Sequence, residues 1–176
     1  MSCTTRRADA GDAATIALLG RLTFRETFAH LFPRHEDDLR LYLDRTFNVG
    51  KIAASIGKAG TYYWIGMVDG LPVGYGKLKV PSKSPAVDAD APAQLQKIYV
   101  LSEFLSRKVG HALMDAIRAE GQRLAIDKAW LNVLSSNMRA IRFYERHGWT
   151  RAGEARFDIG SQSFHFLTLQ TSWAQT

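Results

Sequence analysis

Apolar residues recur every three or four positions through the first part of the chain. Ile16, Leu19 and Leu22 follow this spacing, and Thr23 lies four positions after Leu19. The spacing is the period of one face of an α-helix and predicts a helix over Asp12–Phe28, with Asp12 suited to cap its start. The same reasoning predicts a short strand over Thr4–Ala8, a helix over Arg34–Phe47 and a helical piece over Lys51–Lys58.

The pattern changes period near residue 62. Tyr62–Val68 is aromatic and β-branched, Asp69-Gly70 is a strong turn signal, and Val73–Val80 has the composition of a partner strand. Together they predict a β-hairpin. Pro81–Ala93 is rich in Pro, Ala, Ser and Asp and predicts a loop, which is either functional or only mobile.

The second half alternates strands with helices. A strand followed by a helix and another strand predicts a parallel pair, and the hairpins add antiparallel strands. We therefore expect an α/β (α+β) fold with a mixed, mostly antiparallel central sheet flanked by helices, in a single domain over residues 1–176. The predicted elements are strands over Gln94–Val100 and Lys128–Leu134, helices over Val109–Leu124 and Ser136–Arg146, and a closing hairpin of Trp149–Phe157 with Ser163–Leu169.

Composition narrows the class of protein. The single cysteine, Cys3, cannot form a disulfide within the chain, which favours a reducing compartment, and no apolar run approaches the roughly 18 residues that span a bilayer. We expect a cytoplasmic protein with no membrane partner. The net charge of +6 is scattered among acidic residues, so we expect no nucleic-acid partner. No His/Cys/Asp cluster has metal-ligand spacing, so we expect no metal.

One candidate site lies in residues 95–117, where a strand leads through a short loop into a helix that starts near Val109. The first N–H groups of a helix have no internal partners, and such an end binds phosphate groups. Gly110 lets a ligand approach the backbone, and Arg107 and Lys108 add positive charge. The alternative is an ordinary strand–helix junction with solvated basic residues.

A second candidate site lies in residues 130–149. Asn137, Ile141 and Tyr144 share one helix face, together with Ala140. A phenol directed from a helix into a cleft can act as a general acid. The alternative, and the commoner case for a lone tyrosine, is that Tyr144 packs in the core with its hydroxyl satisfied nearby. Three arginines on another face are expected to be solvated: Arg139, Arg142 and Arg146.

These two stretches, KIYVLSEFLSRKVGHALMDA and WLNVLSSNMRAIRFYERHGW, together resemble the GNAT superfamily of N-acetyltransferases. Within it, RETF, IYV and RFDIGSQSFHFLTL are similar to the spermidine/spermine N-acetyltransferase branch. The resemblance implies acetyl transfer from acetyl-CoA to a small-molecule, polyamine-like primary amine by direct attack, with Tyr144 protonating the leaving thiolate. It also implies a possible homodimer. The implied coenzyme-binding residues are Ile98, Tyr99, Val100, Ser106, Arg107, Lys108, Val109, Gly110, His111, Ala112, Asn137 and Tyr144.

The chain departs from the family pattern at several positions. When the loop is aligned with the family pattern without a gap, Lys108 stands where the family has its first loop glycine, and a side chain there is tolerated if the backbone is helical. An alignment that starts the pattern at Arg107 shifts the loop by two residues. Gln94 and Gln96 replace acidic residues of the polyamine branch, and the general base is therefore undetermined. The candidates for substrate contact are Glu26 and Gln96, and the possible bases are His30, His111 and His165.

Two further functions remain open on this evidence. The acceptor is alternatively an amine of a protein or peptide, or the chain is a non-catalytic module that only binds acetyl-CoA. Acceptor profiling separates the first alternative, and a lack of amine-dependent thiol release identifies the second.

Overall fold

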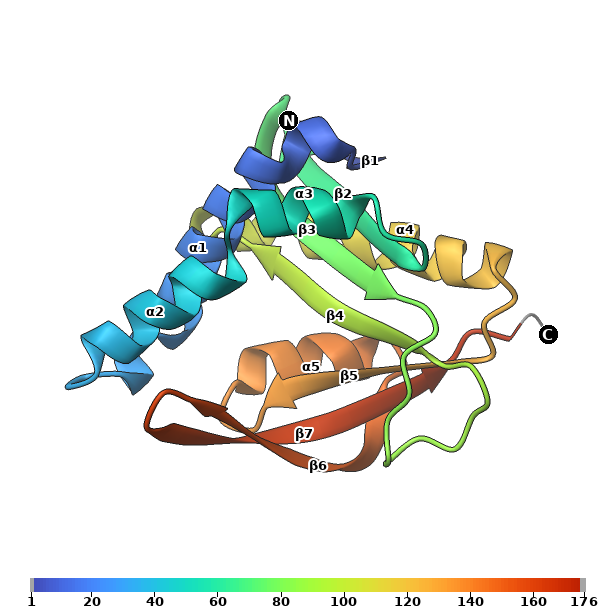
Figure 1. Ribbon diagram of the computed structural model, residues 1–176. Helices are drawn as coiled ribbons and strands as arrows, with labels where there is room; N and C mark the ends of the chain where they lie inside the picture. Colours follow the sequence, from blue (N-terminus) through green and yellow to red (C-terminus); the bar gives the residue numbers. More distant parts are fainter. Residues whose placement is uncertain (1, 175–176) are drawn as a thin grey trace. The chain divides into compact units, whose positions relative to one another are not determined.

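The computed structural model describes residues 2–174, which form two compact units. The first unit contains the chain up to Leu78 together with Lys97–Arg118, and the second contains Lys79–Gln96 and the chain from Ala119 onward. Strand β4 contributes to both. The seven strands have the order β1-β2-β3-β4-β5-β7-β6 and are mostly antiparallel (Figure 1). The predicted mixed α/β sheet flanked by helices is confirmed.

The elements follow the predicted order with small shifts at their ends. In the first unit they are β1 (Cys3–Arg7), η1 (Ala10–Asp12), α1 (Ala13–Phe28), η2 (Ala29–Leu31), α2 (Glu36–Thr46), α3 (Val49–Ile56), β2 (Thr61–Val68), most of β3 (Leu71–Lys79), the C-terminal half of β4 (Ala93–Val100), η3 (Ser102–Arg107) and most of α4 (Val109–Arg123). In the second unit they are β5 (Lys128–Leu134), α5 (Met138–Arg146), β6 (Thr150–Ile159) and β7 (Gln162–Ser172).

The turn between β2 and β3 confirms the predicted hairpin. Asp69 and Gly70 both have positive φ, at 48° and 81°. Two successive residues of this kind form the type I′ turn, whose twist matches that of the flanking strands. Asp and Gly are the residues that adopt this geometry most readily.

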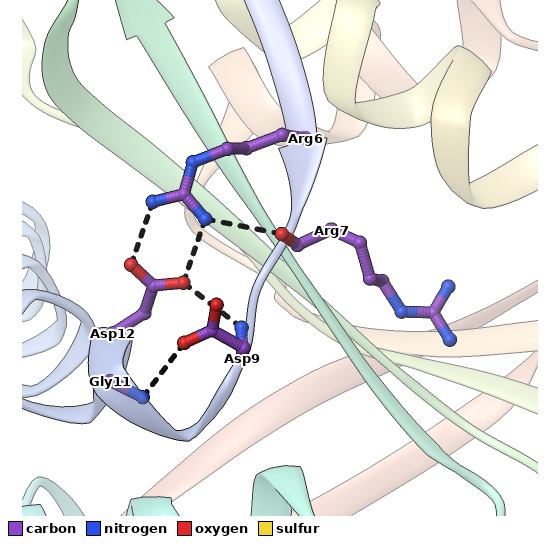
Figure 2. A network of polar contacts seen from close by, with 5 residues as sticks. All are labelled: Arg6, Arg7, Asp9, Gly11 and Asp12. Atoms are coloured by element: carbon purple, nitrogen blue, oxygen red, sulfur yellow. Dashed lines mark hydrogen bonds and ion pairs between the residues drawn. The ribbon is translucent and has the colours of Figure 1, made fainter.

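The start of α1 differs from its prediction. Asp12 makes no capping bond to α1; its carboxylate instead accepts two hydrogen bonds from the guanidinium of Arg6, at 2.7 and 2.8 Å, and one from the N–H of Asp9 (Figure 2). Asp9 caps the preceding 3₁₀ turn by accepting from Gly11 N. The hydrogen bonds from Arg6 lower the pKa of Asp12, so this network joins β1 to the entry of α1 through a carboxylate that stays ionised.

The core of the first unit contains a tight contact between α1 and the end of α2. Gly20 faces the ring of Phe47 so closely that a Cβ there would lie 2.3 Å from a ring carbon and 3.1 Å from the hydroxyl of Tyr75. Phe47 and Tyr75 are 5% and 1% exposed. A glycine is therefore required here by close packing.

The second unit is built on a long antiparallel hairpin. β7 pairs with β5 along its length: Ser172 is opposite Lys128 at one end, and Phe166 is opposite Leu134 at the other. On its other edge β7 pairs with β6. Trp173, just after β7, is buried; its ring lies 6.0 Å from that of Trp149, and a Cβ at Gly121 would lie 2.2 Å from it. Trp173 therefore packs within its own unit.

The loop predicted over Pro81–Ala93 is tied to the strands of the same unit. The indole N–H of Trp130 donates to Ser82 O at 2.6 Å, Lys128 Nζ donates to Asp88 O at 2.8 Å, and the hydroxyl of Ser82 donates to Gln94 Oε1 at 3.0 Å. The loop thus has fixed anchors on β4 and β5. Within residues 2–174, no helix is both long and apolar enough to cross a membrane.

We expect Gly20→Ala to lower the free energy of unfolding by about 1–3 kcal/mol, since the added methyl overpacks a buried ring. This loss outweighs the roughly 1 kcal/mol by which alanine is favoured over glycine in a helix. Urea denaturation of the wild-type protein and of Gly20→Ala measures this loss in the free energy of unfolding.

Gly57→Ala is the matched control, because Gly57 has φ −77° and its nearest outside atom lies 4.0 Å from a built Cβ. Its stability should be unchanged or up to about 1 kcal/mol higher. Equal effects of the two substitutions would contradict the packing account.

Candidate functional site

The C-terminal end of β4 presents backbone groups away from its partner β3. Leu101 N donates to Val73 O at 2.8 Å, which makes these two residues a hydrogen-bonded antiparallel pair. Backbone groups alternate in direction along a strand, so the adjacent residue, Val100, has its N–H directed away from β3. This N–H is available to a ligand at the outer edge of β4.

Gly74 on β3 is what allows the backbones to approach here. A Cβ at Gly74 would lie 2.7 Å from Tyr99 O and 3.3 Å from the Cα of Val100. A larger residue at Gly74 would displace the segment of β4 that contains the exposed N–H. The registered pairing of β4 with β5, at Ala93–Ala129 and Gln94–Trp130, lies at the opposite end of β4.

Glu26 fixes the turn that follows β4. Its carboxylate accepts hydrogen bonds from Ser102 N at 2.9 Å and from the Ser102 hydroxyl at 3.1 Å. Ser102 is the first residue of η3, so a carboxylate from α1 satisfies the start of this 3₁₀ helix. The sequence suggested that Glu26 contacts substrate; in this structure its oxygens hold the loop between β4 and α4.

Lys108, between η3 and α4, has φ 60° and ψ 11°. This is left-handed geometry, so the condition that its backbone be ordinarily helical is not met. The left-handed region costs a non-glycine residue about 1 kcal/mol, which explains why the ungapped register has glycine here. A left-handed residue after a right-handed turn also aligns successive N–H groups into an anion-binding nest.

Helix α4 starts immediately after this residue. Ala112 N donates to Lys108 O at 3.0 Å, so the N–H groups of Val109 and Gly110 lie ahead of the helical hydrogen-bond ladder. Val109 is fully buried and packs with Leu113 against Gly66 of β2. This packing fixes the helix start, while the partial positive charge of the helix end favours a phosphate group.

The predicted coenzyme-binding residues of the first unit thus form one continuous segment. Its strand residues are half-buried, the helix anchor is buried, and the polar loop residues are exposed. Ile98, Tyr99, Val100, Gly110 and Ala112 are half-buried, Val109 is buried, and Ser106, Arg107, Lys108 and His111 are exposed.

Asn137 in the second unit caps α5. Its Oδ1 accepts from Ala140 N at 3.1 Å, so the amide oxygen is used in starting the helix. Asn137 immediately precedes α5, whereas the sequence predicted it inside the first turn. The amide NH₂ is the part of this side chain that a ligand can use.

Tyr144 is 9% exposed and lies on the buried face of α5. Its ring lies 5.4 Å from that of Phe143 and 6.0 Å from that of Trp149. Burial raises the pKa of Tyr144 well above its usual value, so the hydroxyl stays protonated at ordinary pH. The side chain both packs in the core and keeps a proton to donate.

The candidate bases have different surroundings. His165 Nε2 lies 2.8 Å from Glu154 Oε2 on the neighbouring strand, whereas His30 is exposed at η2. Gln96 is half-buried on β4, and the Oε1 of Gln94 accepts from Ser82.

The structure draws attention to one residue that the sequence analysis missed. Lys97 is half-buried on β4, and burial followed by the nearby charge of Lys51 lowers the pKa of Lys97 to about 8. The only sequence signal was a lysine within the strand QLQKIYV, which also fits a solvated strand residue. No group of three His, Cys, Asp or Glu residues suited to a metal is found in the described chain, residues 2–174.

Comparisons with known proteins agree with this arrangement. The model of the acetyltransferase (GNAT) family matches residues 21–149. An uncharacterized N-acetyltransferase encoded in the pepI 3′ region of Lactobacillus delbrueckii subsp. lactis is 31% identical over 139 residues, covering 77% of this chain and 80% of that protein.

Solved structures share the fold at lower identity. The PaiA N-acetyltransferase from Thermoplasma acidophilum, in complex with coenzyme A, has a TM-score of 0.74 and 17% identity, with 98% of this chain and 99% of that chain covered. The ribosomal-protein-S18-alanine N-acetyltransferase from Escherichia coli has a TM-score of 0.67 and 18% identity, with 99% and 96% covered.

Two substitutions test the left-handed geometry at Lys108. We expect Lys108→Gly to be more stable than Lys108→Ala by about 1 kcal/mol, because glycine adopts positive φ without steric cost. Both variants remove the same charge, so their difference in urea denaturation reports the backbone. If residue 108 instead had ordinary helical angles, the alanine variant would be more stable than the glycine variant by about 0.5–1 kcal/mol.

Proposed function

Because the chain belongs to the acetyltransferase (GNAT) family and is accordingly an acetyl-CoA-dependent N-acetyltransferase, we propose that its acceptor is a primary amine of a small molecule. The cosubstrate part of this function is supported by the continuous segment from the end of β4 through η3 to the start of α4. It combines an outward strand N–H with a helix start suited to phosphate.

The start of α4 binds the pyrophosphate of acetyl-CoA. The N–H groups of Val109 and Gly110 precede the helical ladder, and Arg107 and Lys108 are exposed beside them. Backbone donors, the helix dipole and two cations all favour an anion at this position. The residues present therefore fit the cosubstrate.

The N–H of Val100 stabilises the oxygen of the acetyl group as negative charge develops on it. A donor held by a strand needs no reorganisation during the reaction, which is the condition for effective oxyanion stabilisation. The direction of this N–H follows from the Leu101–Val73 bond. Glu26 supports the same geometry by holding Ser102, and this positioning role is the one we propose for it.

Tyr144 supplies the proton that the leaving thiolate takes up. Its raised pKa keeps the proton available, and a thiolate with a pKa near ~8.5 needs only modest assistance. The amide NH₂ of Asn137, two helical turns before Tyr144, contributes a hydrogen bond to the coenzyme.

The acceptor class rests on the residues of β4. Because the chain resembles the polyamine branch, spermidine and spermine are the first acceptors to test. Gln94, Gln96 and Lys97 on β4 provide amides and a cation, and carboxylates are what select a polycation. We therefore expect a monoamine to be acetylated faster than a polyamine.

A panel assay tests this function. Purified protein is mixed with acetyl-CoA and with spermidine, simple alkyl monoamines, lysine peptides, peptides with a free N-terminus and aminoglycosides, and release of free thiol is followed. Faster release with small monoamines supports the proposal. Release only with peptides would assign a protein or peptide acceptor, and acetyl-CoA binding without release from any amine would indicate a binding module.

We expect Tyr144→Phe to lower kcat at least tenfold, because a positioned general acid contributes about 10²–10⁴-fold. The KM for acetyl-CoA should change little, since the ring and its packing remain. Steady-state kinetics on the best panel amine measure both. Tyr62→Phe, in the first unit, is the control for loss of a phenol, and an unchanged kcat in Tyr144→Phe would remove the acid role.

A further inference from the structure

Lys97 lies within the strand that forms the proposed acetyl site. It is separated from Tyr99 by one residue, and alternate residues of a strand project from the same face. Lys97 is half-buried, three residues before Val100. Its amine therefore belongs to the side of β4 that also contains the Tyr99 ring.

Two aromatic rings lie near the amine of Lys97. Its Nζ lies 5.8 Å from the centre of the Phe47 ring and 5.9 Å from that of Tyr99. The ring of Tyr99 in turn stacks on Tyr75 at 6.0 Å and meets Phe28 edge-on at 6.5 Å. The faces of such rings attract a cation, but they provide no negative charge to neutralise it.

Within the described residues, no carboxylate is shown to act on the charge of this amine. Lys51 on α3 is the charge that acts on Lys97, and it acts repulsively. On β3, Lys77 lies over the Tyr63 ring at 5.2 Å, and burial raises the pKa of Tyr75. Burial first, and then Lys51, lower the pKa of Lys97 to about 8.

We propose that Lys97 is the general base of the acetyl transfer, taking from the acceptor's ammonium group the proton that it must lose before attack. The proposal rests on the proposed function. It names a residue for a role that the sequence left undetermined, because Gln94 and Gln96 cannot accept this proton and three histidines remained as possible bases.

The proton balance of the step is complete. The neutral amine of Lys97 accepts one proton from the acceptor R–NH₃⁺, which leaves R–NH₂ and a Lys97 ammonium. The acceptor nitrogen forms a bond to the carbonyl carbon, the carbon–sulfur bond breaks, and the thiolate takes a proton from Tyr144. The new amide nitrogen loses its second proton, and Tyr144 regains one proton through solvent. Lys97 returns its proton to solvent.

The surroundings match this use of the side chain. A half-buried ammonium without a counter-ion is costly, and an apolar side chain would pack against Phe47 and Tyr99 without that cost. A group of lowered pKa is neutral in a useful fraction of molecules near pH 8 and still binds a proton readily. Its neighbour Tyr99 precedes Val100, whose N–H we assign to the acetyl oxygen.

Competitive chemical labelling measures Lys97 without any enzymatic activity. Wild-type protein is treated with trace acetic anhydride across pH 6–11, and the labelling of each lysine is quantified by peptide mass spectrometry. We expect the midpoint for Lys97 near pH 8, as its lowered pKa requires, and that of a lysine in an unstructured reference peptide labelled in the same tube near ~10.4. Coincident midpoints would overturn the proposal.

Kinetics with the fastest amine of the panel test the catalytic role. We expect Lys97→Arg and Lys97→Met to lower kcat/KM at pH 8 by about 10²-fold, with acetyl-CoA affinity by calorimetry unchanged. Arginine keeps the charge and the contact with the rings but cannot release its proton in this pH range. A Lys97→Arg variant with wild-type kcat/KM would show a purely structural role.

Lys51→Gln separates titration from packing, because Lys51 is exposed and acts on Lys97 through its charge. Removing a repulsive positive charge raises the pKa of Lys97, so the labelling midpoint and the acidic limb of the kcat/KM profile should both move to higher pH. Lys58→Gln, with another exposed lysine that follows α3, should leave both in place. An unmoved limb in Lys51→Gln would contradict the proposal.

The failure of the proposed function is recognised separately. Wild-type protein that releases no thiol with any amine fails as a small-amine transferase before any variant is compared. Wild-type protein that turns over normally, with Lys97 variants equally active, leaves the transferase intact and excludes only the base. The labelling experiment uses wild-type protein, so it tests the lowered pKa of Lys97 even if a Lys97 variant does not fold.

Discussion

The hydrogen bond from Leu101 N to Val73 O is the constraint on which the candidate site of the first unit depends. It fixes the antiparallel register of β3 and β4 and so the direction of each N–H along β4. Val100 thereby presents its N–H outward. The same register brings Gly74 against Val100, where a side chain would not fit. Immediately beyond it, Glu26 holds Ser102 and starts η3, so one strand end determines both a donor position and the path into α4.

Charge is arranged unequally along this segment. At the start of α4, exposed cations and backbone donors favour an anion, which suits a phosphate-bearing cosubstrate. Along β4, Gln94 and Gln96 have no charge, and the amine of Lys97 lies near the rings of Phe47 and Tyr99. An amine acceptor must lose a proton in such surroundings. A lysine whose own charge is disfavoured by burial is a chemically different solution from a carboxylate, and it would disfavour acceptors with several positive charges.

Much of the fold could be predicted from the sequence, because it rests on local signals: the Asp69-Gly70 turn, the helical spacing of Ile16, Leu19 and Leu22, and the alternation of strands and helices. Features that depend on tertiary contacts could not. Asp12 has the residue type of a helix cap, yet a neighbouring Arg6 takes its carboxylate. Lys97 resembles any strand lysine until the rings from distant elements are in place. Lys108 was identified from its position in a motif, but its left-handed backbone required the structure.

The end of β4 and the start of α4 form one acetyl-CoA-binding segment, and amide NMR detects ligand binding at each of its residues. Protein labelled with ¹⁵N is titrated with coenzyme A and then with acetyl-CoA. We expect the amide signals of Val109 and Gly110 to shift with both ligands, and that of Val100 to shift further with the acetylated one. The amide of Gly160, in the β6–β7 turn, should stay in place. Saturable binding that leaves the amide signals of Val100, Val109 and Gly110 all unshifted would show that this segment does not bind the coenzyme.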